Sequence, residues 1–307
     1  MQIYHHWQGL DPKAKGASIA MGNFDGVHLG HRSVIDLARA HGPLGVLTFE
    51  PHPREVFAPG APAFRLMNAE ARASQLARIG VEQLYELPFD AFLASLSPHE
   101  FADQVLIEGL GIRHVVVGQD FCFGKGRAGT AKVLQDIGKA HDFSVTIAPL
   151  ITLEGVEISS TAIRLGLSEG RPRDAARMLG HWHRIEGEVL HGEKRGRALG
   201  YPTANMSLKG LHLPRFGSYA VQADVPEGPH KGTHNGVASL GVRPMFGINQ
   251  PNIETFLFDF DGDLYGQHIS VALIDYLRPE MTFDSLATLI AHIDADSAKA
   301  RALLALI

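Results

Sequence analysis

Strand-like and helix-like segments alternate through the first 180 residues, and this alternation limits the folds open to the chain. Apolar segments at 17–21, 44–49, 84–87, 114–117 and 145–148 predict strands. Amphipathic segments at 29–40, 69–79, 98–110 and 130–140 predict helices between them. Such alternation predicts βαβ units and a mostly parallel sheet covered on both faces.

The pattern changes near Gly180, where short β-rich segments begin. They lie at 184–190, 219–223, 236–240, 253–260 and 269–277, and Gly, Pro and Asn separate them. This spacing predicts an antiparallel barrel or sandwich, followed by a helix over 283–304. We therefore expect an α/β domain over residues 1–180 and a β-barrel domain with a terminal helix over residues 181–307.

Composition excludes several classes of protein. Hydrophobic residues make up 45% and charged residues 20%, the balance of a globular enzyme. The net charge of −5 argues against a protein dedicated to nucleic-acid backbones. No apolar run approaches the roughly 20 residues that span a bilayer, and the N-terminus lacks the pattern of a signal peptide. We expect a cytoplasmic protein with small-molecule partners and no nucleic-acid or membrane partner; a weak homo-oligomer stays open.

The segment GNFDGVHLGH, from Gly22 to His31, follows the first predicted strand and opens a helix. Ligands of parallel α/β sheets bind at the carboxyl ends of strands, where helix N-termini offer free N–H groups to phosphate. Gly22 and Gly26 permit close backbone approach. His28 and His31 share one face of a helical turn, where two imidazoles can hydrogen-bond a triphosphate. A tight turn with two solvated histidines is the alternative, which the HxGH spacing disfavours.

HxGH resembles the signature of the nucleotidyltransferase superfamily, which has a Rossmann-like fold and includes class I aminoacyl-tRNA synthetases and several adenylyltransferases. Three further segments narrow the family: TFEPHP (48–53), VGQDFCFGKGRAG (117–129) and ISSTAIR (158–164). Together they resemble the adenylyltransferase module of bacterial bifunctional riboflavin kinase/FAD synthetase. The resemblance implies that His28 and His31 hold phosphates in the transition state, without a covalent enzyme intermediate.

The same resemblance implies a set of binding residues around the two histidines. ATP and its phosphates would contact Gly22, Asn23, Phe24, Asp25, Gly30, Arg127, Ser159, Ser160, Thr161 and Arg164. The flavin would contact His52, Pro53, Asp120 and Phe123. Ser159 and Ser160 stand where a helix cap is expected, with Arg164 in the first turn. We interpret the basic loop around Arg127 as a flap over the phosphates.

A second candidate site lies in GYPTANM, residues 200–206. Pro202 fixes an extended backbone, so Thr203 and Asn205 point the same way. A hydroxyl and an amide oxygen can complete a Mg²⁺ shell whose other ligands are phosphate and water oxygens. Considered alone, this segment is better explained as an ordinary turn.

A carboxylate among aromatic residues strengthens the second site. In NIETFLFDF, the two-residue period of a strand places Glu254 on one face with Phe256, Phe258 and Phe260. A carboxylate in such surroundings suits a general base. The alternative is that Glu254 lies at the solvated end of the strand.

The C-terminal segments GRALGYPTAN, GSYAVQA, ASLGVRP, IETFLFDFDGDLYG and LRPEMTFDSLATLIAHID resemble riboflavin kinase. The resemblance implies that Thr203 and Asn205 serve Mg²⁺ and ATP. It also implies that Glu254 takes the proton from the terminal ribityl hydroxyl of riboflavin. It assigns further ATP contacts to Gly192, Gly196, Arg197, Gly200 and Pro202.

The two resemblances together imply a bifunctional enzyme that requires Mg²⁺. The C-terminal domain would phosphorylate riboflavin with ATP to give FMN, and the N-terminal domain would adenylylate FMN with ATP to give FAD and pyrophosphate. Two alternatives stay open at this level. An RNA-directed enzyme of the same superfamily would show salt-sensitive tRNA binding, and a non-catalytic flavin carrier would bind FMN without turnover.

Overall fold

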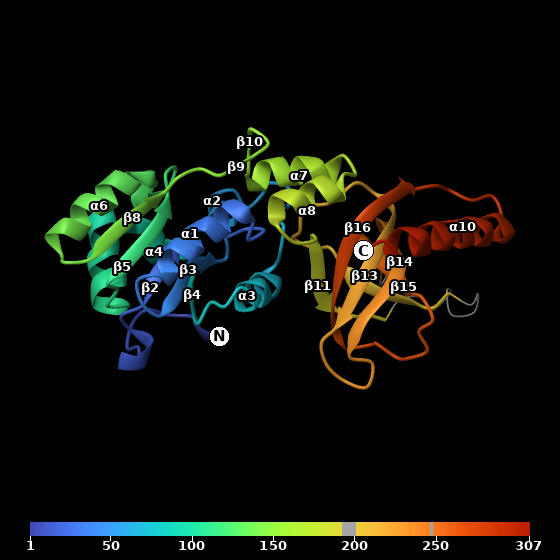
Figure 1. Ribbon diagram of the computed structural model, residues 1–307, viewed down its shortest axis with the longest axis horizontal. Coiled ribbons are helices and arrows are strands. Elements are labelled where there is room, and N and C mark those ends of the chain that lie inside the picture. Colours follow the sequence, from blue (N-terminus) through green and yellow to red (C-terminus); the bar gives the residue numbers. More distant parts are fainter. Residues whose placement is uncertain (192–200, 246–247) are drawn as a thin grey trace. The chain divides into compact units, whose positions relative to one another are not determined.

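The computed structural model describes residues 1–191, 201–245 and 248–307 (Figure 1). The chain divides into two compact units. The first holds residues 1–62 and 72–158, and the second holds residues 63–71 and 159–307. The sequence-based domain boundary at residue 180 stays a prediction, and the compact unit that contains the β-rich segments begins earlier, at Ser159.

The first unit is built on a parallel six-stranded sheet, which confirms the predicted α/β class. Its strands, in spatial order, are β1 (Gln2–Tyr4), β4 (Gln83–Pro88), β3 (Leu44–Glu50), β2 (Ser18–Met21), β5 (His114–Gly118) and β8 (Ser144–Ala148). The sequence did not indicate β1, because only three residues pair with β4 and two of them are exposed. The strand order reverses between β2 and β5, and such a switch point opens a ligand crevice at the carboxyl ends of the strands.

Helices cover both faces of this sheet, as expected. They are α1 (Leu29–Arg39), α2 (Pro53–Phe57), α3 (Ala69–Arg78), α4 (Ala91–Ser95), α5 (Pro98–Phe101), a π-helix η2 (Ala102–Gly109) and α6 (Ala131–Ala140). Short 3₁₀ segments occur at η1 (Pro12–Ala14) and η3 (Lys125–Arg127), and short strand pairs at β6 (Cys122–Phe123) with β7 (Gly129–Thr130) and β9 (Thr152–Leu153) with β10 (Val156–Glu157). Apolar residues of η2 and α6 join one core cluster with β2 and β5. Helix α1 packs against β2, β3 and β5 with its own buried Val34 and Ile35.

The predicted helix over 98–110 is correct in position but changes type along its length. Ser97 and Glu100 form a capping box at its start, so α5 begins as an ordinary α-helix. From Ala102 the helix widens into the π-helix η2. A Cβ at Gly109 would meet Trp7 Cδ1 and the Trp7 carbonyl at 2.9 Å. The glycine therefore lets the wider helix pack on Trp7, a contact that apolar periodicity does not reveal.

A buried polar chain crosses the amino ends of three strands in the first unit. His114 is 2% exposed, and its ring nitrogens lie 2.9 Å from Ser18 Oγ and 2.9 Å from Thr146 Oγ1. The ring also contacts that of His41, with centroids 3.9 Å apart and the planes tilted by 43°. Burial, and secondarily the nearby His41, lowers the pKa of His114 to about 4.

We expect this histidine to make the protein less stable in mild acid. The unfolded state binds a proton with a pKa near 6.5, so stability is lost as the pH falls from about 6.5 toward 4. Between pH 7 and pH 5 the loss attributable to His114 is on the order of 1–2 kcal/mol. Urea unfolding of the wild type and of His114→Gln at both pH values measures it. An equal loss in the variant would contradict the assignment.

The second unit contains two helices, an antiparallel barrel and a terminal helix. The elements are α7 (Ser160–Ser168), α8 (Pro172–Leu179), β11 (Arg184–Glu188), β12 (Thr203–Ser207), β13 (Gly217–Val225), β14 (Gly232–Met245), β15 (Ile248–Leu257), β16 (His268–Pro279) and α10 (Leu286–Leu304). The strand order is β11-β16-β13-β14-β15-β12, and a bridge between Leu190 and Asn205 joins the two ends. The sheet is therefore a nearly closed barrel, which decides between the predicted barrel and sandwich.

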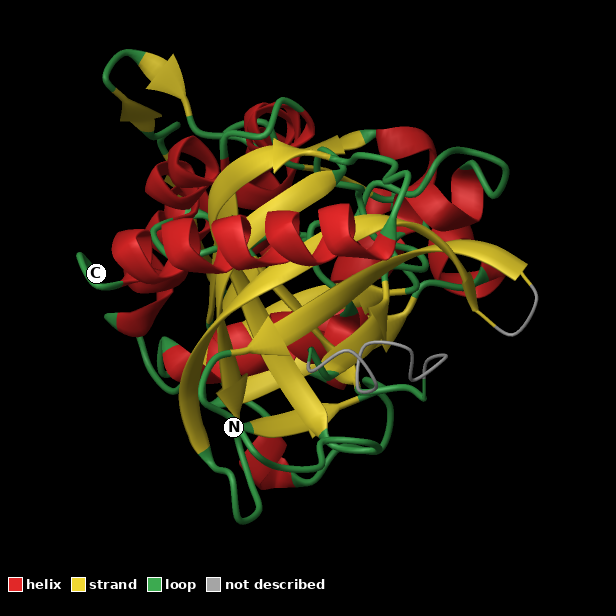
Figure 2. Cartoon of the chain, turned by 90° about the vertical axis from the view of Figure 1, so that its right-hand side faces the viewer, coloured by secondary structure: helices red, strands yellow, loops and turns green. Residues whose placement is uncertain are grey.

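The barrel has an apolar interior and an outer face that α10 partly covers. Tyr219, Val221 and Ile253 belong to the interior cluster. Outward-pointing residues such as Ala220 and Val237 pack with Ala300 and Leu304 of α10. Figure 2 shows this helix running across the strands of the barrel. Arg278 of β16 pairs with the buried Asp296 of α10 at 2.8 Å and fixes the helix. None of the described helices is long and apolar enough to cross a membrane.

Candidate active sites

The loop between β2 and α1 is held in an uncommon backbone conformation at the switch point of the sheet. Phe24 and Val27 adopt φ values of 51° and 43°, which non-glycine residues rarely accept. Both side chains are buried, and this burial offsets the backbone strain. Thr48 Oγ1 of β3 donates to the Asn23 carbonyl at 3.2 Å and ties the loop to the neighbouring strand. The loop is therefore preorganised at the carboxyl edge of the sheet.

His28 is the N-cap of α1. Its Nδ1 accepts the backbone N–H of His31 at 3.2 Å. A neutral imidazole whose Nδ1 accepts a hydrogen bond carries its proton on Nε2, so Nε2–H is a donor. The cap therefore fixes the tautomer of His28 at the helix N-terminus, a place suited to phosphate.

His31 stacks on His28, with ring centroids 3.6 Å apart and an interplanar angle of 17°. The Phe24 ring meets His31 edge-on at 5.2 Å. Burial, and secondarily the neighbouring His28, holds the pKa of His31 well below its usual range. His31 Nδ1 is buried and has no hydrogen-bond partner among the residues that the structure describes. Such a nitrogen is suited to a ligand.

Two glycines make room for this arrangement. A Cβ at Gly30 would come within 3.1 Å of the His28 ring nitrogen Nδ1, so any larger residue would press on the cap. A Cβ at Gly22 would contact the Phe24 ring at 3.5 Å. Asn23 is exposed and Asp25 is buried. The structure thus brings together all the phosphate-site residues predicted between Gly22 and His31.

His52, predicted to contact flavin, begins α2. Its Nδ1 accepts the N–H of Arg54 at 3.0 Å, and its own N–H donates to the Glu55 carboxylate at 3.0 Å. Pro53 is the first residue of the helix, a position that proline favours. The capping box fixes the direction of the His52 ring at the carboxyl end of β3.

Sequence reasoning missed an exposed aromatic residue at the end of this helix. Phe57 is 68% exposed. Its ring packs edge-on against Phe89 at 5.5 Å, and Phe89 packs on Phe49 of β3 at 5.6 Å. The adjacent pair Val56 and Phe57 in an otherwise polar segment is the signal that identifies it. A large exposed aromatic ring beside His52 offers a stacking surface.

The other predicted contacts near this sheet edge follow β5. Asp120 and Arg127 are exposed, and Arg127 has a φ of 58°. Phe123 is only 7% exposed and packs on Phe101 at 5.7 Å, within the core. A Cβ at Gly129 would lie 2.6 Å from the Phe123 ring. Phe123 therefore belongs to the hydrophobic core of the first unit. The contact between Phe123 and flavin stays a prediction.

The ISSTAIR residues from Ser159 to Arg164 belong to the second compact unit, and Ile158 is the last residue of the first. Ser159 caps α7 by accepting the Ala162 N–H at 3.2 Å, which confirms the predicted cap. Ser160 and Thr161 are the first two residues of the helix. Arg164 begins the second turn, so its predicted place in the first turn was wrong by one residue. Its Nε donates to the Phe64 carbonyl at 2.6 Å.

The second site is formed by two neighbouring strands of the barrel. Asn205 of β12 lies directly opposite Glu254 of β15. Asn205 Nδ2 donates to Thr203 Oγ1 at 3.3 Å and to the Thr203 carbonyl at 3.2 Å. The amide oxygen of Asn205 is thereby turned away from Thr203. Glu254 is half-buried and also lies opposite Ser239 of β14.

This face fits a magnesium site by its chemistry. The Thr203 hydroxyl and the Asn205 amide oxygen are hard oxygen ligands of the kind that Mg²⁺ prefers, and the Glu254 carboxylate lies opposite Asn205. Directly opposite residues of antiparallel strands have Cβ atoms about 5 Å apart, so these groups share a small area. The predicted juxtaposition of PTAN with Glu254 is present in the structure.

The aromatic surroundings of Glu254 differ from the prediction in one residue. Phe256 and Phe258 share the outer face with Glu254 and pack with the α10 cluster. Phe260 does not, because β15 ends at Leu257 and Asp259 turns the chain with a φ of 53°. Phe260 packs instead against the interior cluster. The period of a strand does not apply beyond its last paired residue.

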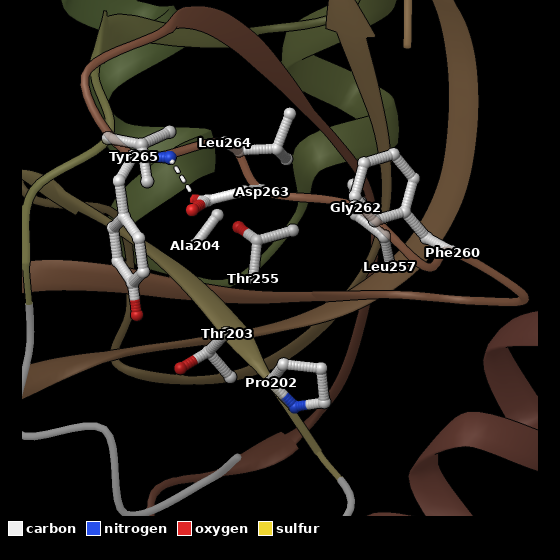
Figure 3. A pocket seen from close by; sticks show the side chains of 11 residues that line it. Pro202, Thr203, Ala204, Thr255, Leu257, Phe260, Gly262, Asp263, Leu264 and Tyr265 are labelled. Carbon is white, nitrogen blue, oxygen red and sulfur yellow. Dashed lines mark hydrogen bonds between the residues drawn. The ribbon is translucent and has the colours of Figure 1, made fainter. Parts of the chain in front are cut away.

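A pocket opens beside Pro202 and Thr203, at one end of the barrel (Figure 3). Its other lining residues are Val189, Ala204, Thr255, Leu257, Phe260, Gly262, Asp263, Leu264 and Tyr265. Thr255 Oγ1 is buried and has no hydrogen-bond partner in the described parts of the chain. The sequence analysis did not identify the side of the pocket formed by DFDGDLYG, because this segment by itself predicts only a turn. The predicted contacts Gly192, Gly196, Arg197 and Gly200 lie outside the described residues.

Comparison with known proteins relates both units to characterised families. The FAD synthetase family model matches residues 10–162, and the riboflavin kinase model matches residues 179–304. The bifunctional riboflavin kinase/FMN adenylyltransferase of Pseudomonas fluorescens is 40% identical over 99% of this chain and 98% of its own length. Its namesake from Escherichia coli K12 is 37% identical over 94% of this chain and 92% of its length, and that from Bacillus subtilis is 38% identical over 98% and 96%.

A solved structure extends the likeness to the whole fold. A crystal structure described as a macrolide-efflux protein from Streptococcus pneumoniae superposes with a TM-score of 0.82 and 31% identity, covering 98% of each chain. The same order of an α/β part and a β-barrel part thus occurs in related proteins. The chain belongs to the family of bifunctional riboflavin kinase/FMN adenylyltransferases, which phosphorylate riboflavin to FMN and adenylylate FMN to FAD.

Proposed function

We propose that His28 and His31 bind the phosphates of ATP during adenylyl transfer. The position of His28 as the N-cap of α1 supports this proposal, as does the buried Nδ1 of His31, which has no hydrogen-bond partner in the described chain. A phosphate oxygen of FMN attacks the α-phosphorus of ATP, and pyrophosphate leaves. Negative charge grows on the leaving group, so donors fixed in advance lower the barrier. The N–H groups at the start of α1 add to the same effect.

We propose that the flavin of this reaction binds near the carboxyl ends of β3 and β5. Phe57 offers an exposed aromatic face at one end of α2, and His52 caps the other end of the same helix. Asp120 lies in the loop after β5. The remaining predicted ATP contacts, Arg127 and the ISSTAIR residues, keep their assignment as proposals.

For the kinase reaction, we propose that Glu254 is the general base. It takes the proton of the terminal ribityl hydroxyl, whose oxygen attacks the γ-phosphorus of ATP, and ADP leaves. Thr203 and Asn205 would hold Mg²⁺, which supplies charge neutralisation to the phosphates when bound. The pocket beside Pro202 would take the adenine, since its walls are mainly apolar. The direct pairing of Asn205 with Glu254 is the observation that carries this assignment.

Small molecules are the partners that these activities require. From composition, we propose that the protein acts in the cytoplasm and has no nucleic-acid or membrane partner. A weak homo-oligomer is likewise only a proposal.

A chromatographic time course tests the two-site proposal. Purified protein with riboflavin, ATP and Mg²⁺ is expected to form FMN first and FAD later, because the product of one site is the substrate of the other. Replacement of Mg²⁺ by EDTA is expected to stop both steps. Formation of FAD from riboflavin without any FMN-dependent step, or no turnover at all, would contradict the proposal.

A further inference from the structure

Asn252 carries a buried amide oxygen for which the described residues provide no hydrogen-bond partner. The residue is 1% exposed, and its Oδ1 is buried without a hydrogen bond in the part of the chain that the structure describes. A buried polar atom left in this state destabilises the folded protein. Folded proteins rarely keep such an atom without a functional reason.

The position of Asn252 connects it with the kinase site. Alternation along β15 places Asn252 on the same face as Glu254, two residues along the strand and roughly 7 Å away. The residues opposite Asn252 are Ser207 of β12 and Gly241 of β14. Glu254 has Asn205 and Ser239 as the corresponding neighbours. The two side chains are thus consecutive members of one row on the outer face of the barrel.

The space beside Asn252 is free of any side chain from β14 itself. A Cβ at Gly241 would collide with Glu280 Oε1, so the Glu280 carboxylate lies over this glycine. Glu280 is exposed, so its carboxylate lies at the solvent side of Gly241. Glu254, Asn252 and Glu280 therefore present oxygen acceptors along one strip. A strip of acceptors suits a ligand with several hydroxyl donors.

We propose that Asn252 Oδ1 accepts a hydrogen bond from an inner hydroxyl of the ribityl chain of riboflavin, and that Asn252 selects for this polyol. The ribityl chain carries hydroxyl groups on successive carbons, so an inner hydroxyl meets Asn252 when the terminal one meets Glu254. The inference rests on the proposed role of Glu254 as the base. Asn252 transfers no proton and acts by recognition alone.

A comparison of two substrates tests this assignment. The second substrate is a flavin with a 5-hydroxypentyl chain at N10, which keeps the ring and the terminal hydroxyl but lacks the inner hydroxyls. Asn252→Leu and Asn252→Ala are expected to lower kcat/KM for riboflavin by roughly tenfold and to leave that for the hydroxypentyl flavin within about twofold. Equal losses for both substrates would overturn the proposal.

Thermal stability separates recognition from a structural role. Leucine has nearly the shape of asparagine and no polar atom, so Asn252→Leu is expected to raise the melting temperature by about 2–4 °C. A lower melting temperature together with an unchanged substrate ratio would show that Asn252 only supports the fold. Asn235→Leu, on the exposed part of β14, is the matched control and should keep the wild-type ratio.

The test is independent of the assignment of the base. Every measurement on Asn252 keeps Glu254 intact. Turnover of the hydroxypentyl flavin checks that the barrel of each variant is folded, and FAD formation from supplied FMN checks the first unit. If Glu254→Gln remains active while Asn252→Leu loses its preference for riboflavin, the base assignment fails and the polyol contact stands. The reverse result would leave the base in place and remove Asn252 from recognition.

Discussion

Glu254→Gln is expected to lower FMN formation by about 10²–10⁴-fold while FAD formation from supplied FMN continues. Glutamine keeps the size of the side chain and its hydrogen-bonding ability but cannot take the proton of the ribityl hydroxyl. The pairing with Asn205 across β12 and β15 should survive, since the backbone register does not depend on this charge. Chromatography of the products from each starting flavin measures both activities.

The control for this variant is Glu227→Gln, which changes an exposed glutamate after β13. It is expected to leave both reactions at the wild-type level. An equal loss of FMN and FAD formation in Glu254→Gln would show one shared site or a damaged fold, and the two-site assignment would fail.

His31→Ala is expected to have the opposite effect, with adenylyl transfer lowered by about 10²–10³-fold and FMN formation retained. The substitution removes a ring that stacks on His28 at 3.6 Å and the buried nitrogen proposed for phosphate. The backbone N–H of residue 31 still reaches the His28 cap, so α1 should keep its start. Pyrophosphate release from FMN and ATP is the measurement.

His99→Ala provides the matched comparison, because His99 is an exposed histidine of α5. It should release pyrophosphate at the wild-type rate. Unchanged release in His31→Ala would remove His31 from its assigned role, and phosphate binding would then fall to His28 and the helix N-terminus.

Much of the fold follows from local patterns in the sequence. Alternating segments predicted the parallel sheet, and the change near Gly180 predicted the barrel, because both signals depend on period and spacing. The HxGH loop was located for the same reason. Glu254 and PTAN were connected through resemblance, and their direct pairing follows from strand register, which single-strand patterns do not encode.

The features that sequence did not predict depend on contacts between distant residues. His28 as a helix cap and Phe24 with a positive φ are set by the packing of one particular loop. Phe260 does not lie on the face predicted for it, because β15 ends three residues before it. The amide oxygen of Asn252, unpartnered among the described residues, could be recognised only when its neighbours on both adjacent strands were known.

The chain belongs to a family with two enzymatic activities. This membership argues against the two alternatives left by the sequence, an RNA-directed enzyme and a non-catalytic flavin carrier. An RNA-directed enzyme would require a nucleic-acid surface, for which neither the net charge nor the family gives support. A flavin carrier would have no need for a carboxylate opposite the PTAN amide.

The long pairing of β14 with β15 also limits how this barrel can change in evolution. Ten consecutive pairs, from Gly236–Leu257 to Met245–Ile248, hold Glu254 and Asn252 on the outer face. A single inserted residue within this paired segment would reverse the side-chain alternation and turn both groups into the apolar interior. Insertions beyond the last pair leave the register intact. Length variation among relatives should therefore concentrate at the tip of this hairpin, and within the strands it should occur only in steps that restore the alternation.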